Sequence, residues 1–169
     1  ASITPMPFDV AGQLVGYFGT KLDAEGLPPA VTPVSRLHLD GTQLRNEQNE
    51  AVFLKGATAF ALYERWLVGT DWPTTEGILN TLQGYGCNAL RVFGMFHYIN
   101  VNEFGRPPFK PQDYGDAYYD SLPRFLKYCK DRGFYVYWAT FPDVGLIMPD
   151  QAEQVAHHDR LVPILRDAG

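Results

Sequence analysis

The stretch Asn-Ala-Leu-Arg-Val-Phe at residues 88–93 has the apolar and β-branched character of a buried strand, interrupted by one charge at Arg91. It closely follows residues 74–84, where apolar side chains recur at helical spacing behind Thr74, a favoured N-cap residue, and where glycines end the run. A helix that leads directly into a buried strand is typical of a strand–helix–strand unit with parallel strands. This passage therefore predicts an α/β protein.

The same alternation continues on both sides of this unit. Residues 52–60, Val-Phe-Leu-Lys-Gly-Ala-Thr-Ala-Phe, predict a first strand that is buried on both faces. Residues 134–140 are aromatic and β-branched and predict a third strand. Helices are expected over residues 121–132, with Ser121 as N-cap, and over residues 150–166. Three successive strand–helix units favour a parallel sheet with helix crossovers.

The chain divides into a leader and one domain. Residues 1–34 contain five prolines and several glycines, which is typical of an irregular leader or interdomain linker. The domain is expected over residues 35–169, and it opens with a small hairpin that turns at Asp40 and Gly41. Because a three-stranded parallel sheet exposes an apolar edge at its third strand, we expect this domain to be incomplete.

Composition excludes several classes of function. The 169 residues are 46% hydrophobic, which suits one globular domain, and the net charge of -5 without basic runs argues against nucleic-acid or anionic-membrane partners. No run approaches the roughly 20 apolar residues of a membrane span. Cys87 and Cys129 are too few for a disulfide framework and are expected as buried free thiols. His157 and His158 are adjacent in a predicted helix and point in different directions, so we expect no metal site.

No cofactor is expected, because no phosphate-binding glycine pattern and no Gly-x-Ser-x-Gly elbow occurs in the chain. Nucleotide-binding and serine-hydrolase functions are therefore excluded at the level of motifs.

Three stretches carry a resemblance to a known family. Residues 37–60, from Leu-His-Leu-Asp-Gly-Thr to Gly-Ala-Thr-Ala-Phe, and residues 86–94, Gly-Cys-Asn-Ala-Leu-Arg-Val-Phe-Gly, resemble the opening of retaining glycoside hydrolases of the (β/α)₈ superfamily. The resemblance is to the endo-mannanase-like and cellulase-like members of glycoside hydrolase family five. Residues 128–138 are similar to the family's passage from helix through Gly into the third strand. The sequence departs from the family where residues 141–143, Phe-Pro-Asp, replace a frequent His and where Thr58 replaces a frequent Asn.

The resemblance implies that the chain is the first three strand–helix units of a TIM barrel, whose full length is about 250 residues. In the family, the acid/base Glu follows the fourth strand and the nucleophile Glu ends the seventh. Both catalytic residues are therefore expected beyond Gly169, and this chain alone is expected to be inactive. The remaining barrel would be a further segment or a separate chain, and the resemblance favours a secreted, extracellular protein.

Arg91 is the candidate supporting residue of the catalytic machinery. It lies near the carboxyl end of the second predicted strand, where barrel active sites are built. A guanidinium there would hold the family's nucleophile carboxylate ionised through paired hydrogen bonds. The alternative is a structural ion pair inside the barrel.

The other candidates follow the predicted strands at the same end of the sheet. Aromatic faces there would stack on sugar rings, and His or Asp would bond hydroxyl groups, whereas the alternative is ordinary loop packing. The substrate-binding candidates are Tyr63, Trp66, Phe96, His97 and Asp143. Glu64 also lies at this end and could approach Asp143, but helix capping or solvent exposure is the favoured explanation for both carboxylates, because the resemblance places the catalytic pair elsewhere.

The sequence thus predicts the N-terminal segment of a retaining glycoside hydrolase that cleaves a β-linked polysaccharide. The alternative is a non-catalytic carbohydrate-binding or structural assembly domain on a barrel-derived scaffold, because a fold does not guarantee activity. Either protein would have an oligo- or polysaccharide as its partner. A continuation with glutamates after the fourth and seventh strands would distinguish the enzyme from the scaffold.

Overall fold

The computed structural model describes residues 32–69, 72–97, 108–142 and 144–168. These residues form a small antiparallel hairpin, a three-stranded sheet and a set of helices, so the α/β class is confirmed. The strands are β1 (His38–Asp40), β2 (Gln43–Arg45), β3 (Gly56–Thr58), β4 (Ala89–Phe93) and β5 (Tyr135–Ala139). The helices are α1 (Leu62–Val68), α2 (Trp72–Gly84), the 3₁₀ turn η1 (Pro111–Asp113), α4 (Asp116–Asp131), α5 (Val144–Ile147) and α6 (Gln151–Asp167).

The main sheet has the order β3-β4-β5, and both pairs of strands are parallel. Its central row consists of Thr58, Arg91 and Tyr137, which are paired across the three strands. Since side chains alternate along a strand, these three lie on one face, and Leu90 and Val92 lie on the other. The sheet order therefore follows the chain order, as expected for successive strand–helix units.

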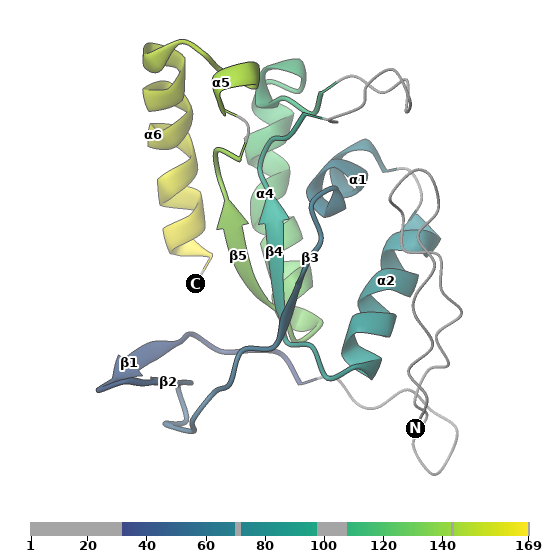
Figure 1. Ribbon diagram of the computed structural model, residues 1–169, viewed down its shortest axis with the longest axis vertical. Coiled ribbons are helices and arrows are strands. Elements are labelled where there is room, and N and C mark those ends of the chain that lie inside the picture. Colours follow the sequence, from purple (N-terminus) through teal and green to yellow (C-terminus); the bar gives the residue numbers. More distant parts are fainter. Residues whose placement is uncertain (1–31, 70–71, 98–107, 143, 169) are drawn as a thin grey trace.

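The helices pack on the face of the sheet that carries Leu90 and Val92. Both side chains are fully buried, and α1, α4 and α6 contribute to the core beneath them. Figure 1 shows α4 running behind the sheet, with α1 and α2 to one side and α6 to the other. No described helix covers the opposite face, where Tyr137 is 66% exposed. The described sheet is therefore a two-layer structure with one open face.

The first predicted strand is shorter and more exposed than expected. Ladder pairing is limited to Gly56–Thr58, and Phe53 just before it is 86% exposed. The expectation of burial on both faces is therefore wrong for this strand. A strand is buried on both faces only when both sides of the sheet are covered, and here one side is open.

Two helix predictions also need correction. Ser121 does not cap a helix: α4 begins at Asp116, and the Ser121 hydroxyl lies inside it, where it donates to the carbonyl of Ala117 over 2.7 Å. Residues expected as a loop after the first strand form α1, which ends at Gly69 in a left-handed conformation with φ 68°. Tertiary packing of the aromatic side chains of α1 on α4 stabilises this short helix.

The start of the last helix was predicted closely. α6 begins at Gln151, and the Asp150 carboxylate accepts the backbone N–H groups of Ala152 and Glu153 over 2.7 and 3.0 Å. None of the helices within the described residues is long and apolar enough to cross a membrane. Both cysteines are free thiols; Cys129 is buried, which raises its pKa to about 12, whereas Cys87 is only half-buried.

Candidate functional site

The open face of the sheet carries one charged side chain, Arg91, in the middle of its central row. The guanidinium carbon of Arg91 lies 4.7 Å from the ring centroid of Phe93, its neighbour two residues along β4. Thr58 and Tyr137 flank Arg91 on the adjacent strands. Among the residues that the structure describes, none forms an ion pair with Arg91.

Arg91 was expected in an otherwise apolar buried strand, where its charge would require a partner. It is instead exposed, because the alternation of β4 directs it to the uncovered face. A guanidinium offers five N–H donors in a planar fork and no acceptor. The arrangement can therefore receive a carboxylate in paired hydrogen bonds, or hydroxyl oxygens one at a time, beside the aromatic surface of Phe93 and Tyr137.

Tyr63 lies in the core rather than at the sheet surface. It is fully buried on α1, where it is packed edge-on against the rings of Tyr118 and Trp138. Its hydroxyl donates to the carbonyl of Tyr118 and lies 3.0 Å from the Ser121 hydroxyl oxygen. Burial raises the pKa of Tyr63 to about 12. Both faces of this ring are therefore used in packing, and none is open to a sugar.

Trp66 and Phe96 also take part in packing. Trp66 is half-buried between α1 and α4, with its ring 5.1 Å from that of Tyr128. Phe96 is buried and pairs edge-on with Phe60, at a ring separation of 5.2 Å, and is bridged through its backbone to Phe109. For Trp66 and Phe96, these contacts fit ordinary packing, which was the alternative to stacking on a sugar ring.

The two remaining candidates are less informative. His97 is half-buried directly after Phe96. Asp143 lies outside the described residues, so its approach to Glu64, which is half-buried on α1, is not defined. The structure thus gathers Tyr63, Trp66 and Phe96 in the core, whereas Arg91 stands on the open face.

Sequence reasoning missed Tyr137 as a member of this face. Its signal was present, because residues 135–139 alternate Tyr-Val-Tyr-Trp-Ala and position 137 shares a face with Tyr135. The strand was predicted from its aromatic and β-branched composition, and its alternation was not used. Because every second side chain of a strand points to the same face, the alternation along β5 identifies the side chains on the open face.

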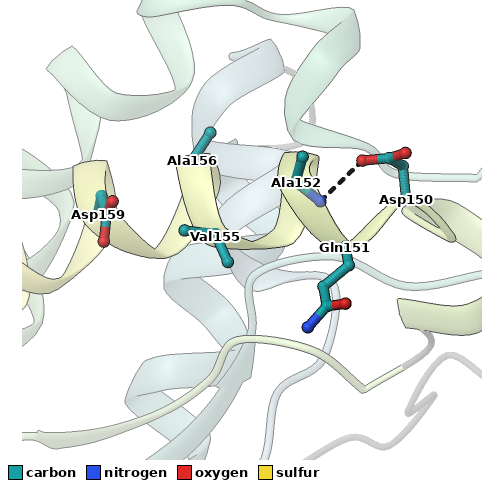
Figure 2. A pocket seen from close by; sticks show the side chains of 6 residues that line it. All are labelled: Asp150, Gln151, Ala152, Val155, Ala156 and Asp159. Carbon is teal, nitrogen blue, oxygen red and sulfur yellow. Dashed lines mark hydrogen bonds between the residues drawn. The ribbon is translucent and has the colours of Figure 1, made fainter.

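A concave region lined by residues at the start and in the middle of α6 is shown in Figure 2. Its acidic residue at the helix start, Asp150, already accepts backbone N–H groups as N-cap. Its lining residues are Asp150, Gln151, Ala152, Val155, Ala156 and Asp159. Without a cation or a convergent set of donors among these residues, the hollow defines no binding chemistry.

Comparison with known proteins adds no family to this picture: no family model, no curated protein and no solved structure matches the chain. Within the described residues, no group of three or more His, Cys, Asp or Glu side chains is placed to hold a metal ion. Functional inference therefore rests on the open face around Arg91.

Proposed function

We propose that this chain is the N-terminal part of a retaining glycoside hydrolase that cleaves a β-linked polysaccharide. In this proposal the chain is the first three strand–helix units of a (β/α)₈ barrel, and its open sheet face becomes part of the barrel interior. It contributes to the sugar-binding cleft but does not supply the two catalytic glutamates.

The observation that carries this proposal is the positively charged Arg91 side chain at the centre of the open face of the parallel sheet. Arg91 is exposed between Thr58 and Tyr137, and it rests on Phe93 without an ion pair among the described residues. In a TIM barrel, helices cover the outer face of the strands, while inward side chains near the carboxyl ends reach the active site. The one-sided helix layer and the sequential strand order both support such a barrel segment.

Arg91 would have two tasks in the completed cleft. Its fork of N–H donors would hold the nucleophile carboxylate supplied by the missing part, and its positive charge would keep that carboxylate ionised by lowering its pKa. The adjacent rings of Phe93 and Tyr137 would provide apolar surface beside the sugar. Because the two carboxyl groups of a retaining enzyme lie outside this chain, it binds sugar without cleaving it.

Oligosaccharide binding to the chain alone tests the proposal directly. We expect mannohexaose or cellohexaose to perturb amide resonances of β4 and β5 in a ¹⁵N-labelled sample. Hydrogen bonds to a charged group contribute about 1.5–3 kcal/mol, so Arg91→Ala should weaken this binding roughly tenfold or more. The matched control is Arg45→Ala, since Arg45 is paired with Asp40 on the hairpin and should leave the affinity unchanged.

Two outcomes would contradict the proposal. Perturbations that avoid the open face, or an affinity equally reduced in both variants, would remove Arg91 from the cleft. Release of reducing ends from mannan or β-glucan by the chain alone, lost in Arg91→Ala, would show that the catalytic groups are within these residues. A longer reading frame without glutamates after the fourth and seventh strands would favour the non-catalytic alternative.

A further inference from the structure

Helix α6 is attached to the described fold through a narrow contact with α4. Only His157 and Leu161 of this helix are buried, and they lie one helical turn apart on the same side. Ile164 and Leu165 are partly buried against the core. Among the described elements, α6 makes its extensive contact with α4, whereas α1 and α4 contact the strands β4 and β5. Separation of α6 would therefore leave the helices that cover the sheet in place.

The polar contacts between α6 and α4 converge on Tyr119. The Tyr119 hydroxyl oxygen lies 2.6 Å from Nδ1 of His157, and the guanidinium carbon of Arg160 lies 3.8 Å from the centre of the Tyr119 ring. Arg160 also forms an ion pair of 2.7 Å with the exposed Asp116. One side chain of α4 thus contacts both the titratable His157 and the permanently charged Arg160.

The surroundings of His157 suit a neutral imidazole and not an imidazolium. The centroid of its ring lies 5.7, 5.6 and 5.7 Å from those of Tyr118, Tyr119 and Phe141. Its Nε2 is buried without a hydrogen-bond partner in the described part of the chain. An imidazolium carries an N–H on each ring nitrogen, and the Tyr119 hydroxyl can accept only one of them. The second N–H and the positive charge would be buried without compensation.

The charges around His157 also disfavour its protonation while α6 is in place. The titratable and charged groups near it on α4 and α6 are Asp116, Tyr118, Tyr119, Glu153, His158 and Arg160. The Asp116 carboxylate is already paired with Arg160, and Glu153 is exposed and forms no ion pair with another described residue. Burial, together with the positive charges of His158 and Arg160, lowers the pKa of His157.

We propose that α6 is an acid-sensitive element: protonation of His157 releases α6 from α4 while the three-stranded sheet keeps its packing. Release exposes Leu161 on α6 and Tyr119 on α4, and it lets both imidazolium N–H groups bond to water. The released helix therefore takes up a proton below pH 6.5, whereas the packed helix does so only near pH 4. From this difference, the equilibrium constant for release should rise roughly thirtyfold between pH 7.5 and pH 5.

This inference does not depend on the proposed function, because it uses no residue of the open sheet face. Sugar binding at Arg91 and release of α6 are measured separately. The failure of one proposal therefore leaves the other standing.

Native-state hydrogen exchange in low urea tests whether α6 opens by itself. Local opening exposes less surface than unfolding of the whole chain, so it depends less on urea. At pH 5 we expect the amides of residues 155–165 to be less protected than those of β4. Low urea should accelerate exchange in β4 and leave exchange in α6 nearly unchanged. Equal protection and equal urea dependence of the two elements would show that α6 opens only with the whole molecule, and would overturn the proposal.

Variants of the two adjacent histidines test whether His157 controls the release. After correction for the intrinsic pH dependence of exchange, protection of α6 in the unmodified chain should fall roughly thirtyfold from pH 7.5 to pH 5. His157→Phe retains a ring among the aromatic side chains but does not titrate, so it should reduce this fall to less than about threefold. His157→Asn serves the same purpose if the Phe variant does not fold. The matched control, His158→Asn at the exposed neighbouring position, should keep most of the fall.

Two results of the variant experiment would overturn the proposal. Protection of α6 that is the same at pH 7.5 and pH 5 in the unmodified chain would show that an imidazolium is accommodated beside Tyr119. A fall of the same size in the His157 variants would assign the acid response to other groups.

Discussion

The buried side chain of His157 has a pKa that its surroundings lower. It is only 2% exposed, on the side of α6 that faces α4, and its Nδ1 lies 2.6 Å from the Tyr119 hydroxyl oxygen. Its Nε2 is buried without a hydrogen-bond partner among the described residues. Burial, together with the positive charges of His158 and Arg160, lowers the pKa of His157 to about 4. The folded protein therefore holds this imidazole neutral.

The lowered pKa of His157 predicts a loss of stability in acid. In the unfolded chain the imidazole titrates near 6.5, so between pH 6.5 and about 4 the unfolded state binds more protons than the folded state. Above pH 6.5 the neutral His157 lowers the free energy of unfolding by nothing. As the pH drops towards 4, the free energy of unfolding should fall by roughly 2–3 kcal/mol. Urea denaturation at a series of pH values measures this slope.

A matched pair of variants separates His157 from the other acid-sensitive groups. Asn retains a polar atom near the Nδ1 position but does not titrate, so His157→Asn should flatten the slope between pH 6.5 and 4. His158→Asn, at the exposed neighbouring position, should leave the slope unchanged. If both variants behave like the unmodified chain, His157 does not set the acid response.

Gly94 is required by a close approach of side chains. A Cβ at this position would lie 2.9 Å from the Trp138 indole nitrogen and 2.9 Å from the Tyr118 hydroxyl oxygen, which donates to the Gly94 carbonyl. We expect Gly94→Ala to reduce the free energy of unfolding by about 1–3 kcal/mol because the core must shift. Gly77→Ala, in open space on α2, should instead raise it by roughly 0.5–1 kcal/mol. Thermal unfolding of both variants tests the contrast; equal signs would contradict it.

At the scale of elements, the start of a helix could be predicted from nearby residues when a side chain caps that helix. The helix expected over residues 150–166 starts within one residue of α6, where the Asp150 carboxylate satisfies backbone donors within the next three residues. The start of α4 carried no such signal: its N-cap is Gly115, without a side-chain hydrogen bond, so Ser121 was chosen instead. α1 was missed because its seven residues are stabilised by packing on α4 rather than by helix propensity.

The cap of α6 predicts an element-scale effect. Asp150→Ala removes the acceptor for the N–H groups of Ala152 and Glu153, and we expect a loss of about 1 kcal/mol in the free energy of unfolding. Asp159→Ala, an exposed acidic position in the middle of the same helix, should change it by less than about 0.5 kcal/mol. Chemical denaturation of the two variants measures the difference, and equal losses would contradict the capping role.

At the scale of the whole molecule, α2 and α4 are joined by a polar network that their separation in sequence concealed. Glu76 on α2 accepts the hydroxyl of Tyr128 and forms an ion pair of 2.7 Å with Arg132, just beyond the end of α4. Burial and the hydrogen bond to Glu76 raise the pKa of Tyr128 above its usual range. A carboxylate shared by two donors links the two helices.

Removal of this shared carboxylate should loosen the helix layer. Glu76→Ala leaves Tyr128 and Arg132 without their acceptor, and we expect a loss of about 1–2 kcal/mol, since the pair is only partly exposed. Asp131→Ala breaks the exposed Lys127–Asp131 pair of 2.5 Å on α4 and should cost less than about 0.5 kcal/mol. Hydrogen exchange of α2 amides, together with urea denaturation, tests this; equal losses would rule out a special role for Glu76.

The sequence by itself determined the α/β class, the three parallel strands and the position of α6, because these depend on hydrophobic period and on signals within a few residues. It also identified Arg91 as the unusual charge in an apolar strand. Only the tertiary structure decided that Arg91 faces outward while Tyr63 is buried in the core. Which side of a strand or loop is covered depends on helices distant in the chain, and no local pattern encodes that choice.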